Sequence, residues 1–403
     1  MPCLRQLPSR ESFPPPASRP RFFRRGAGRT VFTLCILFGV LVLAEIALRI
    51  ISARAQQREN SRSGHYSLSL YATDGKTNLS DHDGRLMLVL DPFVTYRNLP
   101  NQRDPWFTIN SRGYRGPEPD PNPAVTRIVL VGGSTAFGSG AESDDATIAR
   151  ALERRLPNVQ VINAAVNGHV STDELTLLQK ELLDLNPALV IALGAFNDAH
   201  LAYVLEGGRV QTNSTFRDLE LRLIRLQAIE SNPLRGFWAF ARSIFPEVLS
   251  RAEKLERLPG RIRQDFQGEM PDDPLEPKIR NYTSNILEME SLCRSRGAGF
   301  LAVLQPQRPN EWRHAEYYSK RYNQFIESAD RAFGSAGIDY LNLHAAGEIR
   351  TDHFFPGDDV HFNAAGAEAV AEIIAARIRE HNLLSAEPQI AEPPVAASPP
   401  AAP

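Results

Sequence analysis

Five runs of consecutive apolar residues constrain the fold of this chain most. They are RIVLVGG (127–133), VQVIN (159–163), ALVIALG (188–194), FLAVLQP (300–306) and IDYLNL (338–343). Strands of this kind are buried on both faces, as in parallel sheets covered by helices. The segments between them have helical periodicity, and one begins with a predicted capping box, Ser171-x-x-Glu174. We therefore expect an α/β fold with a doubly wound sheet of about five parallel strands, in which functional side chains lie beyond the carboxyl ends of the strands.

The apolar stretch at residues 30–51 is long enough to cross a hydrocarbon core of about 30 Å. Seven arginines precede it and three follow closely, so residues 1–29 are predicted to be a cytoplasmic basic leader, with the rest of the chain outside the membrane. Within the stretch, Glu45 and Arg49 are spaced to pair on one helix face. The alternative is a cleavable signal peptide with an Ala-x-Ala site at 53–55. In both cases the C-terminal part of the chain is exported from the cytoplasm.

Changes in composition divide the remainder of the chain. The predicted parts are a stalk and extended lead-in (52–125), a catalytic domain (126–384) with a helical insertion (about 202–285), and a disordered Pro/Ala tail (385–403). The insertion contains LELRLIRLQAI (219–229) and the aromatic run FWAFARSIF (237–245). These segments suit a lid over an acyl pocket, an element facing the membrane, or simply helices that pack on each other.

Charge and cysteine content exclude several classes of function. The 45 basic and 47 acidic residues give a net charge of −2, so no positive field is present to hold a nucleic acid. The three cysteines form no CxxC pair, so neither a disulfide framework nor a thiolate metal site is indicated.

Four turns that follow predicted strands carry residues suited to acyl transfer. The first turn, GGSTAFG, presents Ser134 near a helix N-terminus and lacks the Lys-Ser/Thr of a phosphate-binding loop. The next two contain Gly168 and Asn197, and PGDDVHFNAAG near the C-terminus contains Asp358 and His361. A serine needs a base to take its proton, and the imidazole needs an acceptor that fixes its tautomer. Ser134, His361 and Asp358 supply that chain of groups.

Other interpretations of the C-terminal turn remain open. One alternative is that His361 is an ordinary loop histidine. A hard-metal cluster is the second alternative, and its ligands would be Asp352, His353, Asp358, Asp359 and His361.

The order of these motifs resembles the SGNH/GDSL hydrolase family, whose blocks centre on a Ser, a Gly, an Asn and a His. The resemblance covers roughly residues 125–380 and points to a membrane-anchored bacterial subset with GGS at the nucleophile. It implies a flavodoxin-like three-layer α/β/α fold and hydrolysis of acyl esters without a metal or organic cofactor. It also implies an oxyanion hole formed by the backbone N–H groups of Ser134 and Gly168 and the side chain of Asn197.

Two positions depart from the family pattern. Gly133 stands where an Asp usually precedes the nucleophile, and the third block reads GAFND (194–198) instead of G-x-N-D. In that block either Ala195 stands at the glycine position or the turn is one residue longer.

The resulting hypothesis is a serine esterase held by a single span in a bacterial inner membrane, with an extracytoplasmic catalytic domain. Short acyl esters such as acetyl groups, on a cell-envelope glycan, are the expected substrates. The alternatives are an O-acyltransferase acting on an exported polysaccharide and a catalytically idle glycan-binding module.

Overall fold

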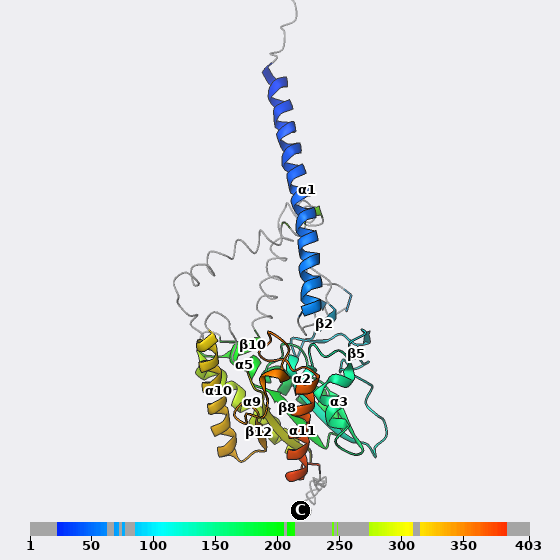
Figure 1. Ribbon diagram of the computed structural model, residues 1–403, viewed down its shortest axis with the longest axis vertical. Coiled ribbons are helices and arrows are strands. Elements are labelled where there is room, and N and C mark those ends of the chain that lie inside the picture. The colour runs from blue at the N-terminus through cyan, green and yellow to red at the C-terminus, as the bar shows by residue number, and fades with distance from the viewer. Residues whose placement is uncertain are drawn as a thin grey trace, which may run out of the picture.

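A parallel sheet forms the centre of the catalytic domain (Figure 1). The computed structural model describes residues 22–62, 68–71, 75–76, 85–204, 208–213, 244–245, 248, 274–308 and 315–384. The five strands are β6 (Thr126–Gly132), β7 (Val159–Asn163), β8 (Leu189–Gly194), β11 (Gly299–Leu304) and β12 (Tyr340–Asn342). Their spatial order, β7-β6-β8-β11-β12, with all neighbours parallel, is the flavodoxin-like order. This confirms the predicted fold and all five predicted strands.

Helices cover both faces of this sheet and bury most of its residues. One face packs against α3 (Ile148–Glu153) and α11 (Ala364–Glu380); the other packs against α4 (Ser171–Leu177), α9 (Leu275–Ser295) and α10 (Ala315–Ala336). Within β6, Ile128 and Leu130 join the first core, whereas Val129 and Val131 join the second. Because successive side chains of a strand point to opposite faces, a strand between two helical layers has to be apolar throughout.

The lead-in is folded onto the catalytic domain. It contains β1 (Leu68–Tyr71), β2 (Leu86–Leu90), β3 (Tyr96–Asn98), β4 (Gln102–Arg103) and β5 (Thr108–Ile109). Leu86 and Phe107 belong to the same hydrophobic core as α3 and α11. The backbone N–H of Arg115 donates to the carbonyl of Asn163 at the end of β7, with an N···O distance of 2.9 Å. Residues 86–116 are therefore structurally part of the catalytic domain, whose predicted first residue was 126.

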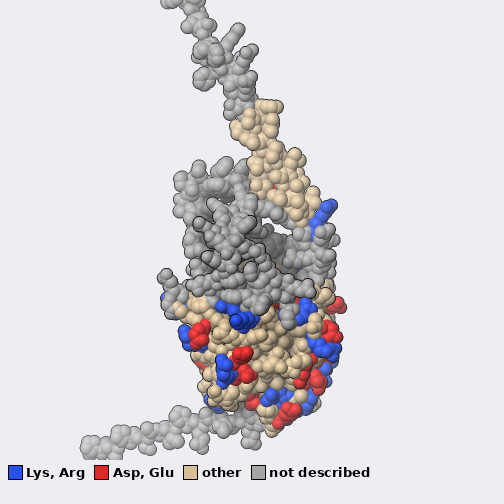
Figure 2. Space-filling view, turned by 60° about the vertical axis from the view of Figure 1, so that its left-hand side comes forward, with Lys and Arg blue, Asp and Glu red and all other residues tan. Residues whose placement is uncertain are grey.

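Helix α1 (Phe22–Arg62) contains a segment, Val31–Ile51, that is long and apolar enough to span a membrane. In the described part of the chain, fourteen large apolar side chains are exposed, and twelve of them belong to this segment. Figure 2 shows the contrast, with a nearly uncharged rod above a domain whose surface mixes acidic and basic side chains. The predicted pair is confirmed, since Arg49 Nε lies 2.8 Å from Glu45 Oε1.

The described parts of the insertion lie at its two ends and at three residues between them. β9 (Ala202–Val204) and β10 (Val210–Asn213) form an antiparallel hairpin. Residues 275–285, assigned to the insertion from the sequence, instead begin α9, where Leu275, Ile279 and Tyr282 are buried in the core. Their mixed polar sequence obscured the buried face of this helix. The segment 219–229 and most of 237–245 lie outside the described residues.

Two of the three intermediate residues contact the apolar helix. The rings of Phe245 and Phe38 are 5.7 Å apart between centroids, and the N–H of Val248 donates to Glu45 Oε2 at 2.8 Å. Glu45 is thereby buried although it lies in a segment of mostly exposed side chains.

Candidate active site

The turn after β6 delivers Ser134 to the carboxyl end of the sheet. Strand β6 ends at Gly132, and Ser134 is the first residue of the short helix α2 (Ser134–Phe137). Gly132 has φ +151°, and a Cβ there would overlap the Leu193 carbonyl of the neighbouring strand, so only glycine fits this close approach. Ser134 itself remains partly exposed, so its hydroxyl can be reached from outside.

A chain of hydrogen bonds links Ser134 to the C-terminal turn. His361 Nε2 lies 2.7 Å from Ser134 Oγ, and His361 Nδ1 lies 2.9 Å from Asp358 Oδ2. The other oxygen of Asp358 accepts the backbone N–H groups of Val360 and His361 at 2.8 and 2.9 Å. These contacts fix the carboxylate, which in turn orients the imidazole. The three predicted residues thus meet in the geometry that activates a serine hydroxyl.

The remaining members of the alternative metal cluster point elsewhere. Asp359 accepts from Gln307 Nε2 at 3.3 Å, Asp352 pairs with Arg350 at 3.0 Å, and His353 Nδ1 accepts the N–H of Arg350. Within the described ranges, no group of three or more His, Cys, Asp or Glu residues is arranged to hold a metal ion.

Gly168 and Asn197 lie in the turns after β7 and β8, which flank β6 on its two sides. Gly168 has φ +83°, the left-handed conformation that glycine adopts without strain. Asn197 belongs to α5 (Phe196–His200), and its Nδ2 donates to the carbonyl of His169 at 2.7 Å. This bond ties the third block to the second, so both turns have a fixed position beside α2.

The structure explains both departures from the family pattern. A Cβ at Gly133 would overlap Nδ2 of Asn197, so glycine leaves the space that this amide occupies. Ala195 has φ +97° and immediately precedes α5. That conformation favours glycine and is strained for an L-residue, so Ala195 occupies the glycine position of G-x-N-D and the turn is not lengthened.

Comparison with protein families identifies the family of this chain. The model of the GDSL-like Lipase/Acylhydrolase family matches residues 130–369, more than half of the chain. The chain belongs to this family. It is therefore an ester hydrolase, as the motif order predicted. No curated protein sequence matches this GDSL-like hydrolase.

Solved structures similar to this GDSL-like hydrolase share little of its sequence. A lipase/acylhydrolase from Enterococcus faecalis is 17% identical, with 64% of this chain and 96% of that chain covered and a TM-score of 0.38. A lipolytic protein of the G-D-S-L family from Desulfitobacterium hafniense is 12% identical (62% and 99% covered, TM-score 0.37). A catalytic mutant of an acetylxylan esterase from Geobacillus stearothermophilus is 11% identical (63% and 94% covered, TM-score 0.36).

A buried group of carboxyls supports the second and third blocks of this GDSL-like hydrolase. Asp198 accepts the Ser171 hydroxyl at 2.6 Å and the Ser171 N–H at 3.1 Å, and Asp173 accepts the Val170 N–H at 3.2 Å. Burial raises the pKa of Asp173 and of Asp198 to about 7. Burial also raises the pKa of Glu174 well above its usual value, and the nearby charges of Asp198 and Asp173 raise that pKa further. The predicted capping box from Ser171 to Glu174 is wrong, because Asp198, 27 residues away, binds the serine instead.

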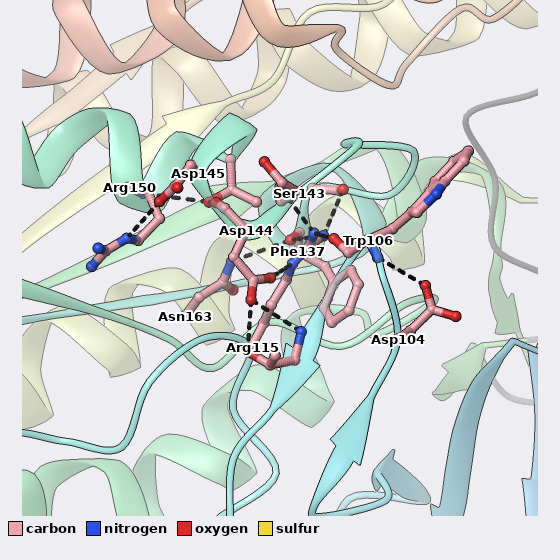
Figure 3. Close-up of polar contacts among 12 residues, drawn as sticks. Asp104, Trp106, Arg115, Phe137, Ser143, Asp144, Asp145, Arg150 and Asn163 are labelled. Atoms are coloured by element: carbon pink, nitrogen blue, oxygen red, sulfur yellow. Dashed lines mark hydrogen bonds and ion pairs between the residues drawn. The ribbon is translucent and has the colours of Figure 1, made fainter.

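Sequence reasoning missed Arg115, which lies against the far end of α2 (Figure 3). Its side chain is 1% exposed, and Nε pairs with Asp144 Oδ1 at 2.8 Å. The other two nitrogens donate to backbone carbonyls, Nη1 to Phe137 and Gly138 and Nη2 to Trp106 and Ser143, at 2.8–3.3 Å. No short motif marks this arginine, because its partners are spread over more than thirty residues of the chain.

Proposed function

We propose that the protein is a membrane-anchored serine esterase whose nucleophile is Ser134. The hydrogen-bonded chain from Asp358 through His361 to Ser134 is the observation that carries this proposal. His361 takes the proton of the hydroxyl as Ser134 attacks the ester carbonyl and returns it to the leaving alcohol. Asp358 holds the imidazole in the required tautomer. Water then attacks the acyl-enzyme with His361 again as the base, which releases the acid and restores the serine.

The developing oxyanion is assigned to the N–H groups of Ser134 and Gly168 and to Nδ2 of Asn197. Ser134 N–H lies at the start of α2, where the backbone donors of the first turn point outward. The Asn197 amide carries a second hydrogen atom besides the one that it donates to His169. That hydrogen is available to the substrate. Donors that are already fixed before the reaction stabilise the transition state without reorganisation.

We also propose that Val31–Ile51 is an uncleaved anchor with the catalytic domain outside the cytoplasm. The exposed apolar side chains of this segment and the arginines before it support this topology. In Figure 1, α2 and α5 lie in the half of the domain nearer to α1. An active site on that side suits esters carried close to a bilayer, and an acetylated cell-envelope glycan is the first substrate class to test.

Two experiments test these proposals. Purified full-length protein in detergent is assayed on p-nitrophenyl esters of graded chain length, beside Ser134→Ala as the matched control. We expect turnover that is fastest for the acetyl ester and absent in the variant; turnover that survives in Ser134→Ala would refute the nucleophile. A reporter fused after residue 384 is expected to be active outside the cytoplasm, and cytoplasmic activity would refute the topology.

A further inference from the structure

Part of the lead-in, residues 94–116, lies outside the match to the family and yet contacts both turns assigned to the oxyanion hole. One contact is made by Arg115 at the end of α2. The other is made by Tyr96 and Asn98 on the loop after β7.

Helix α2 is a single turn of four residues, too short to be stable alone. Its last carbonyls have no partners within the helix and require donors from elsewhere. Arg115 donates hydrogen bonds to the carbonyls of Phe137 and Gly138. Asn163 Nδ2 donates to the carbonyls of Ala136 and Phe137, each at 3.2 Å. The position of Ser134 at the start of the turn thus depends on the groups that hold its end. Figure 3 shows Arg115 and Asn163, from two different segments, beside Phe137 at the end of this helix.

The loop that carries Gly168 is held in a similar way. The Tyr96 hydroxyl donates to the Asn167 carbonyl at 3.0 Å, and Asn98 Nδ2 donates to the Ala165 carbonyl at 3.2 Å. His169 Nε2 donates to the Tyr96 carbonyl at 2.7 Å, which places the next residue after Gly168 against β3. Burial lowers the pKa of His169 to about 4, so the ring is neutral and donates from this nitrogen at neutral pH. The lead-in therefore fixes the peptide group that precedes Gly168 and the side chain of the residue that follows it.

We propose that Arg115 and Tyr96 are positioning residues for ester hydrolysis, which set the two backbone donors of the oxyanion hole at Ser134 and Gly168. The proposal rests on the oxyanion hole assigned above. It makes the lead-in a working part of the active site and not only a connection to the anchor. Small displacements of a reacting group lower the rate strongly, so the effect of these residues falls on turnover more than on substrate binding.

The chain provides matched controls for both residues. Tyr114 is another buried lead-in tyrosine whose hydroxyl donates one hydrogen bond of 3.0 Å, but to Glu181, away from the site. Arg97 is another lead-in arginine with a carboxylate partner, again Glu181, at 2.7 Å. Tyr96→Phe is therefore compared with Tyr114→Phe, and Arg115→Lys with Arg97→Lys, in the full-length protein in detergent. For each variant kcat, KM, Tm and the rate of Ser134 phosphonylation by a fluorophosphonate are measured.

Tyr96→Phe is expected to lower kcat by about three- to tenfold, the usual effect of one hydrogen bond, while KM stays within about twofold. Arg115→Lys is expected to lower kcat by about 10²-fold, because an ammonium cannot replace a planar group with five donors. Phosphonylation should slow by the same factors. The two control variants should keep kcat within about twofold even where their Tm falls as much as that of their counterparts.

The proposal is overturned if Tyr96→Phe and Tyr114→Phe have the same kcat, or if the Tyr96 variant changes KM alone. Should Arg115→Lys fail to fold, the tyrosine pair still decides the question. Phosphonylation of the unmodified protein at Ser134 separates this result from the proposed function. If the label appears there and the tyrosine variants are equal, only the positioning role fails; if the label appears elsewhere, both fail.

Discussion

Replacing Gly133 by alanine is expected to disable the amide of Asn197 while leaving the triad in place. A Cβ at residue 133 would overlap Nδ2 of Asn197 and lie 3.2 Å from its Cγ. Non-bonded heavy atoms pack at about 3.5–4.0 Å, so the amide would have to rotate away from its present position. That rotation breaks its 2.7 Å bond to the His169 carbonyl and moves away the second hydrogen atom, which we propose to bind the oxyanion.

The size of the effect follows from the loss of one oxyanion donor. Such a loss costs about 2.7–4 kcal/mol of transition-state stabilisation, or about 10²–10³-fold in kcat. We therefore expect Gly133→Ala to lower kcat by at least about 10²-fold with KM little changed. The backbone should tolerate alanine, because Gly133 has φ −86° and ψ −152°, an extended conformation at the edge of the β region with negative φ.

A double-mutant cycle on an activated acetyl ester tests the reasoning. Asn197→Ala alone should lower kcat by the same factor as Gly133→Ala. In the double variant, Gly133→Ala should add less than about threefold, because the nearest remaining neighbour of the new Cβ is the His169 oxygen at 3.4 Å. Near-normal kcat in Gly133→Ala, or losses that multiply in the double variant, would refute the argument.

Two further predictions follow from other contacts. Asp358→Asn should lower kcat by up to about 10⁴-fold, because the imidazole of His361 is no longer held in the required tautomer. Asp359→Asn should change kcat by less than about tenfold. Steady-state kinetics that give the reverse ranking would contradict the assignment. Because burial raises the pKa of Glu174, its protonated form is favoured by folding, so its contribution to stability is full below pH 4.5 and is lost as pH rises toward the folded pKa. Glu174→Gln should flatten the fall of Tm as the pH rises above 4.5, and an unchanged slope in calorimetry would disprove the effect.

The sequence was sufficient to predict the strands and the residues that meet at their carboxyl ends. Burial on both faces leaves a continuous apolar run, which locates a strand such as β6 without tertiary information. Parallel strands bring their carboxyl ends together, so residues as distant as Ser134 and His361 could be expected to meet. The short motifs after the strands then indicated which side chains meet there.

Contacts between distant segments were not predictable in the same way. The local sequence around Ser171 predicts a capping box with Glu174. In the folded chain the Ser171 hydroxyl instead donates to the buried carboxylate of Asp198. Arg115 looks like a surface arginine in its own stretch, and only the folded chain brings carbonyls from three segments around it. The strain at Ala195 is likewise invisible until its φ of +97° is known. Each of these depends on tertiary packing that overrides local preference.

The most direct test of the account is to identify the residue that a fluorophosphonate modifies. Full-length protein is labelled to completion, and its intact mass is measured by mass spectrometry. Digestion with trypsin then releases residues 128–150 as one peptide, which contains Ser134, Ser139 and Ser143. We predict one adduct per chain, located on Ser134, absent in Ser134→Ala and formed far more slowly in His361→Ala. An adduct on another residue, or unchanged labelling of Ser134→Ala, would contradict the claim that this serine is the nucleophile.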